Sequence, residues 1–147
     1  MIIRVSEFEM MQAAIIHSVS WKASHMDICS PEFIELHTPE RQYHFLKTTV
    51  ENGAELYMLI EYKPIGIVSI NKNIIVNLYV LPDEHNKGYG TKLLMFAVDK
   101  CEGDPSLWIL NTNEGAKRLY ERNGFRPTGN IVKHKDGLYE LELSLKK

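Results

Sequence analysis

A buried strand that runs into a glycine-containing turn and then into a helix is the feature that most constrains this chain. The strand is predicted over residues 74–81 (IIVNLYVL), and the helix over residues 88–101, with Gly88 and Gly90 at its start. The first amides of a helix have no acceptor within the helix, and the helix dipole makes that end positive. Because neither glycine has a side chain that blocks access, this turn suits a phosphate or pyrophosphate group.

The spacing of the glycines excludes two common phosphate-binding patterns. A Walker loop requires GxxxxGK[ST], which the sequence lacks. The dinucleotide pattern GxGxxG fails because the residue three positions after Gly90 is Leu93. By itself, the turn is also compatible with two glycines that bind no ligand.

The rest of the chain alternates between strand and helix patterns, which predicts an α/β domain with a mixed sheet. The other strands are predicted at residues 1–5, 54–62, 65–71, 107–110 and 137–145. Helices are predicted from Ser6 onward and at residues 31–36, 38–52 and 114–122. In the first helix, helical spacing relates Phe8, Met11, Ala14, Ile15 and Val19. Residues 21–30 carry no clear pattern.

Length and composition indicate one packed domain over residues 1–147, with 44% apolar and 24% charged residues. The net charge is −2 and Lys and Arg form no cluster, so we expect neither nucleic acid nor a membrane surface as a partner. The N-terminus does not resemble a signal peptide, and no apolar stretch approaches the roughly 20 residues of a membrane span. These features predict a cytoplasmic protein.

The two cysteines, Cys29 and Cys101, are far apart in the sequence and belong to no CxxC or Cys/His pattern. We therefore expect reduced thiols and no metal site.

A second motif follows the strand at residues 107–110. Together, residues 85–90 (HNKGYG) and 113–125 (NEGAKRLYERNGF) resemble two motifs of the GNAT superfamily of N-acetyltransferases. That family has a [Gln/Arg]-x-x-Gly-x-[Gly/Ala] loop after its fourth strand and Asn-x-x-Ala-x-x-Leu-Tyr-x-x-x-Gly-Phe after its fifth. The second motif matches at Asn113, Ala116, Leu119, Tyr120, Gly124 and Phe125.

The resemblance implies a fold and a reaction. The fold is a mixed, mostly antiparallel sheet of six to seven strands flanked by helices, with the fourth and fifth strands splayed apart. The reaction is direct transfer of an acetyl group from acetyl-CoA to a primary amine, without a metal or a covalent intermediate. The implied coenzyme-binding residues are Leu78, Tyr79, Val80, His85, Asn86, Lys87, Gly88, Tyr89, Gly90, Thr91, Asn113, Ala116 and Tyr120.

Several of these residues have implied roles. Amides of residues 85–91 would hold the pyrophosphate, and the strand edge at residues 78–80 would pair with the pantetheine arm. An amide near Val80 would polarise the thioester carbonyl. Asn113 would hydrogen-bond the pantetheine arm. Tyr120 matches the general acid that protonates the departing thiolate, although its pattern alone also fits a core aromatic residue.

The loop departs from the family pattern at two positions. His85 stands where the family usually has Gln or Arg, and Asn86 replaces a frequent Gly. A histidine can still donate a hydrogen bond to phosphate, and both changes leave the backbone amides in place. We therefore expect the phosphate site to persist.

The general base is not identified by the sequence. Some family members carry a Glu in the fourth strand, but residues 74–81 contain no carboxylate. Glu61, His25 and Asp27 remain as candidates, the last two in a segment that starts at Trp21 and falls where the family shapes its acceptor pocket. Our hypothesis is that deprotonation runs through ordered water, or that the acceptor is an α-amine with a pKa of about 7.7–8.0 rather than a lysine near 10.4.

The acceptor itself stays open between a small molecule and a peptide, and so does a homodimer. Two other functions also fit the sequence. One is a non-catalytic module of the same fold that binds acyl-CoA, and the other is a nucleotide-binding protein of another class.

Overall fold

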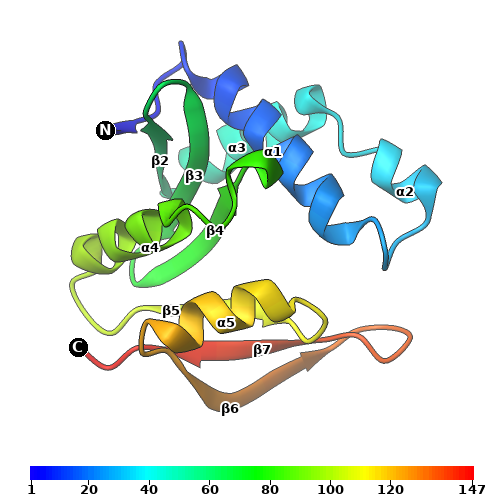
Figure 1. Cartoon of the computed structure of the whole chain (residues 1–147), viewed down its shortest axis with the longest axis vertical. Coiled ribbons are helices and arrows are strands. Elements are labelled where there is room, and N and C mark those ends of the chain that lie inside the picture. The colour runs from blue at the N-terminus through cyan, green and yellow to red at the C-terminus, as the bar shows by residue number, and fades with distance from the viewer.

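The computed structural model describes residues 1–147, which form seven strands in one sheet with helices on both faces (Figure 1). The strands are β1 (Ile2–Arg4), β2 (Glu55–Ile60), β3 (Pro64–Asn71), β4 (Ile74–Val80), β5 (Ser106–Leu110), β6 (Arg126–Lys133) and β7 (Tyr139–Ser144). The helices are α1 (Met10–His25), α2 (Pro31–Glu35), α3 (Pro39–Glu51), α4 (Tyr89–Lys100) and α5 (Glu114–Arg122), with a 3₁₀ turn η1 (Pro82–Glu84) after β4.

The sheet consists of two antiparallel parts that meet at one parallel joint. Its strand order is β1-β2-β3-β4-β5-β7-β6, and β4–β5 is the parallel pair. Those two strands pair at Ile74 and Ser106 alone, beside a hydrogen bond of 2.9 Å from the Ser106 amide to the Asn73 carbonyl. Beyond this point β4 and β5 diverge. The mixed, mostly antiparallel sheet with splayed fourth and fifth strands confirms the predicted fold.

The two faces of the sheet bury two separate apolar cores. Alternate residues of β2 illustrate the division, because successive side chains of a strand point to opposite faces. Tyr57 and Leu59 belong to the larger core, which α4 and α5 cover. Leu56 and Met58 belong to the smaller core, which α1 and α3 cover. A ligand in the gap between β4 and β5 therefore meets α4 and α5 on one side and α1 on the other.

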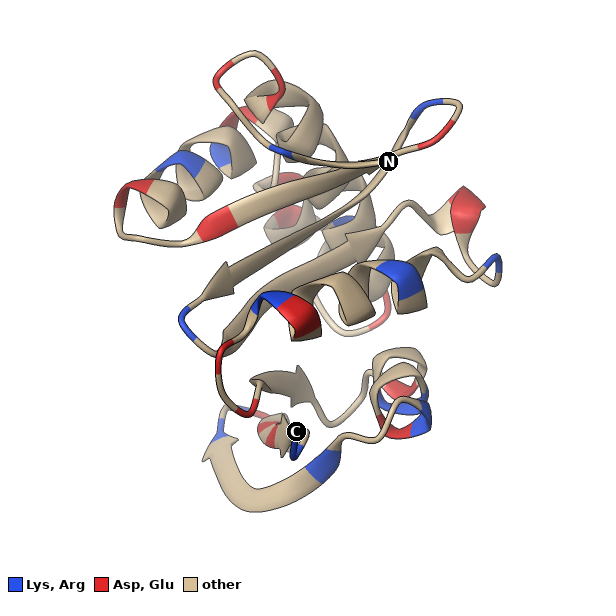
Figure 2. Ribbon diagram, turned by 90° about the vertical axis from the view of Figure 1, so that its left-hand side faces the viewer, with Lys and Arg blue, Asp and Glu red and all other residues tan.

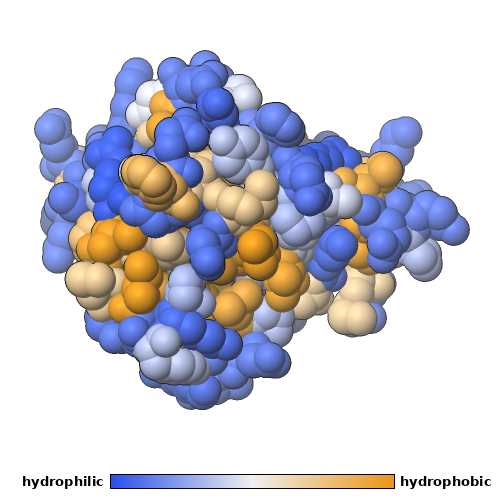
Figure 3. All heavy atoms as spheres, turned by 90° about the horizontal axis from the view of Figure 1, so that it is seen from above, coloured by the Kyte–Doolittle hydropathy of each residue, from blue (hydrophilic) through white to orange (hydrophobic).

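The first helix differs from the prediction in its limits and in its buried face. It begins at Met10 rather than after Ser6, and it continues to His25 through part of the unassigned segment. Ala14 is buried as its spacing suggested, but four of the apolar residues on that pattern are exposed, namely Phe8, Met11, Ile15 and Val19. The buried side instead includes His17, Ser18 and Ser20. Because these residues are polar, the apolar pattern did not indicate which face of the helix is buried. Apolar side chains are accordingly visible among polar ones at the surface (Figure 3).

Strand β6 was not predicted. All of its residues are exposed, and it contains Pro127 and Gly129, which has a φ of 97° beside an irregularity in the β6–β7 register. Proline and glycine are depleted from strand interiors but occur at sheet edges and bulges. An edge position explains why the segment lacks the apolar pattern of a strand.

Acidic and basic residues are dispersed along the ribbon rather than gathered on one face (Figure 2). The structure contains no helix that combines the length and the apolar character needed to cross a bilayer.

Candidate active site

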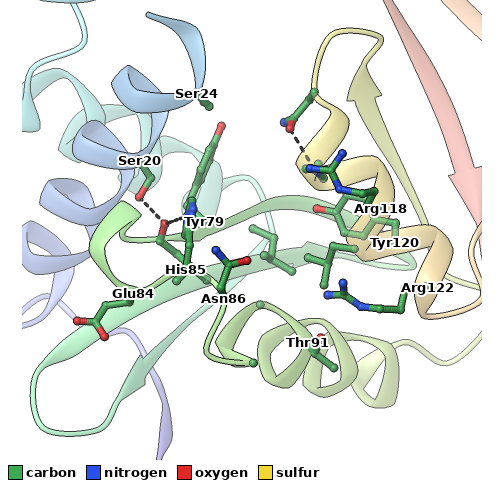
Figure 4. A pocket seen from close by; sticks show the side chains of 18 residues that line it. Ser20, Ser24, Tyr79, Glu84, His85, Asn86, Thr91, Arg118, Tyr120 and Arg122 are labelled. Carbon is green, nitrogen blue, oxygen red and sulfur yellow. Dashed lines mark hydrogen bonds between the residues drawn. The ribbon is translucent and has the colours of Figure 1, made fainter.

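A cavity of about 320 Å³ opens where β4 and β5 separate (Figure 4). Every predicted coenzyme-binding residue lines this cavity except Lys87 and Tyr89. Sequence reasoning did not assign seven further lining residues to the site, namely Ser20, Ser24, Glu84, Gly115, Arg118, Leu119 and Arg122. The cavity therefore combines the end of β4, the loop before α4, one side of α5 and one side of α1.

The loop before α4 presents a run of free backbone amides. The amides of residues 86–91 donate no hydrogen bond within the chain, and α4 begins at Tyr89. The expected run of free amides began at His85, but the His85 amide donates a hydrogen bond of 3.3 Å to the Pro82 carbonyl. Asn86 and Gly88 both have positive φ, 63° and 85°, a conformation that Asn tolerates and Gly adopts freely. Alternating handedness of this kind turns successive N–H groups toward one point and makes an anion-binding concavity. The loop thus fits a phosphate group, and Asn86 adopts the positive φ at the position where the family frequently has Gly.

A buried carboxylate fastens this loop to the β2–β3 hairpin. Glu84 is 3% exposed and accepts a hydrogen bond from the hydroxyl of Tyr62. Its oxygens also lie 3.0 Å from Lys87 Nζ and 3.4 Å from Lys63 Nζ. The hydrogen bond from Tyr62, and after it the contact with Lys87, lowers the pKa of the Glu84 carboxyl. Lys87 therefore holds the loop through Glu84, which explains why it does not line the cavity.

His85 supports the loop instead of facing a phosphate. Its Nε2 donates a hydrogen bond of 2.9 Å to the carbonyl oxygen of Val80, which also accepts one of 3.3 Å from the hydroxyl of Ser20. These two bonds tie the end of β4 to the loop and to α1. The Nε2 of His85 is therefore bound within the chain and does not serve as the phosphate donor that a histidine at this position could provide.

The free edge of β4 faces the gap. The Leu81 amide donates to Ile65 on β3, and hydrogen-bonding direction alternates along an antiparallel strand. The N–H groups of Leu78 and Val80 therefore point away from β3 and toward the gap. An extended amide-containing chain can hydrogen-bond such an edge as an added strand does.

Tyr120 enters the gap from α5. The residue is 7% exposed and its ring packs against Phe125, with ring centroids 5.9 Å apart. No residue of the chain hydrogen-bonds its hydroxyl. Every side-chain oxygen without a partner in this structure is accessible to solvent. The hydroxyl therefore opens into the cavity. Burial raises the pKa of Tyr120, so the phenol is protonated at neutral pH and can donate a hydrogen bond.

Two further polar features lie on α5. The Asn113 side chain caps the helix, because its Oδ1 accepts a hydrogen bond of 3.1 Å from the Ala116 amide. Its Nδ2 makes no bond within the chain and is free to face the cavity.

Arg118 and Arg122 line the cavity one helical turn apart and form no ion pair. Their i, i+4 spacing after a strand was the sequence signal that could have identified them.

None of the three candidate bases lines the cavity. Glu61 lies 2.7 Å from Lys92 Nζ, and this hydrogen bond lowers the pKa of the Glu61 carboxyl. Asp27 is exposed beyond the end of α1. His25 is next to the lining residue Ser24 and its Nδ1 lies 2.8 Å from the Ser24 hydroxyl oxygen. Of the three, His25 alone contacts a residue that lines the cavity.

Comparison with known proteins agrees with this geometry. The model of the acetyltransferase (GNAT) family matches residues 22–125. The chain belongs to this family. Its two sequence motifs therefore identified the family correctly, and membership supports acetyl transfer as the general reaction.

Solved structures show the same GNAT fold at low sequence identity. The PaiA N-acetyltransferase from Thermoplasma acidophilum, in complex with coenzyme A, superposes with a TM-score of 0.75 and 21% identity, covering 100% of this chain and 98% of that one. YjaB from Escherichia coli gives 0.71 and 22%, covering 98% and 95%. A GNAT-family acetyltransferase from Bacillus cereus gives 0.74 and 17%, covering 100% and 96%. No curated protein matches the sequence.

The GNAT domain contains no group of three or more His, Cys, Asp or Glu residues arranged to hold a metal ion. Cys101 is 2% exposed at the end of α4, and burial raises the pKa of its thiol. A buried, protonated thiol is a poor nucleophile.

Proposed function

We propose that this GNAT protein transfers the acetyl group of acetyl-CoA directly to a primary amine, with Tyr120 as the general acid. The observation that carries the proposal is the joining of two features in one cavity. The free amides of residues 86–91 suit a pyrophosphate, and the hydroxyl of Tyr120 opens into the slot between β4 and β5. A similar fold, the PaiA N-acetyltransferase, holds coenzyme A.

The parts of the cavity fit successive parts of acetyl-CoA. The loop amides, with Arg118 and Arg122 nearby, suit the phosphates. The free edge of β4 at Leu78 and Val80 suits the amides of the pantetheine arm. The arm would carry the thioester past Val80 toward Tyr120, and the Val80 amide would polarise the thioester carbonyl.

Transfer then forms one bond and breaks another. The amine nitrogen attacks the thioester carbon, the carbon–sulfur bond breaks, and the sulfur leaves with the electron pair of that bond. The phenol of Tyr120 donates its proton to this sulfur. The nitrogen gives up its extra proton to water, because no unpaired carboxylate lines the cavity and Glu84 is bound by Tyr62, Lys63 and Lys87.

Thiol release from acetyl-CoA with a panel of amines tests the function. The panel should include α-amino acids, polyamines, lysine peptides and peptides with a free N-terminus. We expect turnover with at least one amine and a decrease in kcat of at least about a hundredfold in Tyr120→Phe, with coenzyme affinity retained. Coenzyme binding without turnover on any amine would instead support a non-catalytic acyl-CoA-binding module.

A further inference from the structure

Two tyrosines reach the cavity from opposite faces of the sheet. Tyr120 belongs to the core covered by α4 and α5, whereas Tyr79 of β4 packs against the core covered by α1 and α3. Both residues line the same cavity. Figure 4 shows the ring of Tyr79 directed toward Ser24 of α1, while Tyr120 projects from α5 on the other side.

The hydroxyl of Tyr79 is free to meet a ligand. As with Tyr120, no residue of the chain hydrogen-bonds this hydroxyl. Every side-chain oxygen without a partner is accessible to solvent, so this oxygen is accessible as well. A phenol otherwise surrounded by protein usually finds a partner for its hydroxyl. The Tyr79 oxygen has no partner within the chain and is accessible to solvent, and the residue lines the cavity.

The two sides of the cavity differ in the groups that they offer. The α4–α5 side holds the free amides of residues 86–91 and the guanidinium groups of Arg118 and Arg122, which suit an anionic coenzyme. The α1 side presents hydroxyl groups from Ser20, Ser24 and Tyr79. A coenzyme held on the first side leaves the second side for the acceptor.

We propose that the hydroxyl of Tyr79 binds the acceptor amine and orients it toward the thioester. This inference rests on the proposed function. The phenol oxygen accepts a hydrogen bond from the amine N–H, which leaves the nitrogen lone pair free to point at the thioester carbon. Orientation of this kind is a recognised source of rate enhancement.

The surroundings of Tyr79 hold its ring in place for this role. His17 packs edge-on against the ring, with centroids 4.8 Å apart and planes at 79°. His17 is itself 3% exposed, and its Nδ1 accepts a hydrogen bond from the side-chain Nε2 of Gln42. Burial raises the pKa of Tyr79 to about 12, so its hydroxyl stays neutral at the pH where amines react.

The test compares Tyr79→Phe with two other tyrosine variants on an amine that the wild type acetylates. Tyr79→Phe retains the ring and its packing, and we expect kcat/KM for the amine to fall roughly tenfold, mostly through a higher KM. The dissociation constant for coenzyme A should not change. Tyr120→Phe should lower kcat instead. Tyr43→Phe is the control and should match the wild type. Tyr43 lies on α3, outside the cavity, and its hydroxyl donates a hydrogen bond of 3.3 Å to Glu7.

Two results would overturn the inference and leave the proposed function intact. One is a Tyr79→Phe enzyme whose kcat/KM for the amine stays within twofold of the wild type. The other is a crystal structure with acetyl-CoA in which the pantetheine arm covers the Tyr79 hydroxyl, which decides the matter even when no acceptor is known. Wild-type protein that binds acetyl-CoA but acetylates no amine would count against the proposed function, and against this inference with it.

Discussion

The ring of His17 lies edge-on to the ring of Tyr79, and the two residues come from α1 and β4. This contact joins a buried histidine to a residue that lines the cavity. His17 also hydrogen-bonds the side chain of Gln42 on α3. The same three-element contact that orients Tyr79 therefore also affects how stability depends on pH.

We predict that His17 makes the folded state sensitive to mild acid. Burial lowers the pKa of His17 to about 4, whereas an unfolded chain has a value near 6.5. Below pH 6.5 the unfolded state binds a proton that the folded state refuses, so stability falls as the pH decreases toward 4 and is fully present above 6.5. The whole window corresponds to roughly 3 kcal/mol. Urea unfolding from pH 7 to pH 4 should show a flatter dependence in His17→Gln, and equal slopes would contradict the account.

We predict that Gly88→Ala impairs coenzyme binding beyond its effect on stability. Gly88 has a φ of 85° and open space where a Cβ would lie, and Gly129 in β6 has a φ of 97° and is equally open. Alanine at either position should cost roughly 1–2 kcal/mol, because the backbone is left-handed. Calorimetry with coenzyme A should then show weaker binding for Gly88→Ala and wild-type affinity for Gly129→Ala. Equal affinities would place the phosphates elsewhere.

We predict that Arg118 and Arg122 contribute electrostatically to coenzyme affinity. Each guanidinium lines the cavity without an ion-pair partner. Replacing either residue with Gln should weaken binding several-fold at low salt and reduce the dependence of affinity on ionic strength. Lys117→Gln on the same helix, outside the cavity, is the control. A salt dependence unchanged in both arginine variants would argue against this role.

We predict that Glu84→Gln loosens the loop before α4. The substitution removes the charge that Lys63 and Lys87 share, so the midpoint of thermal unfolding should fall by several degrees at pH 7. The lowered pKa of Glu84 means that this stabilisation is present above the unfolded value near 4.3 and is lost as the pH falls further. The difference in midpoint should therefore shrink in acid. The exposed Glu102→Gln should show no difference at either pH, and a wild-type midpoint in Glu84→Gln would refute the loop's dependence on this carboxylate.

Much of the fold could be predicted because its local signals agree with its tertiary contacts. The β2–β4 meander, α4 and α5 carry apolar patterns and turn residues that match their final positions. The first helix misled the prediction, because its buried face includes His17 and Ser20 while Met11 and Ile15 face solvent. Strand β6 could not be predicted, because an exposed edge strand needs no apolar pattern.

The site divides in the same way. Backbone amides before α4 and the position of Tyr120 follow from local motifs, so the sequence could indicate them. The side chain of Tyr79 could not be assigned from the sequence, because its role depends on which face of β4 meets α1. The ion pair between Lys87 and Glu84, and the hydrogen bond from His85 to the Val80 carbonyl, likewise depend on contacts that only the folded chain makes.

The most direct measurement is isothermal titration of the purified, folded protein with acetyl-CoA. We predict a one-to-one complex with saturable heat at micromolar to sub-millimolar concentration. The affinity should be weaker in Gly88→Ala and unchanged in Tyr120→Phe and Tyr79→Phe. Absence of any binding heat at millimolar acetyl-CoA would contradict this prediction.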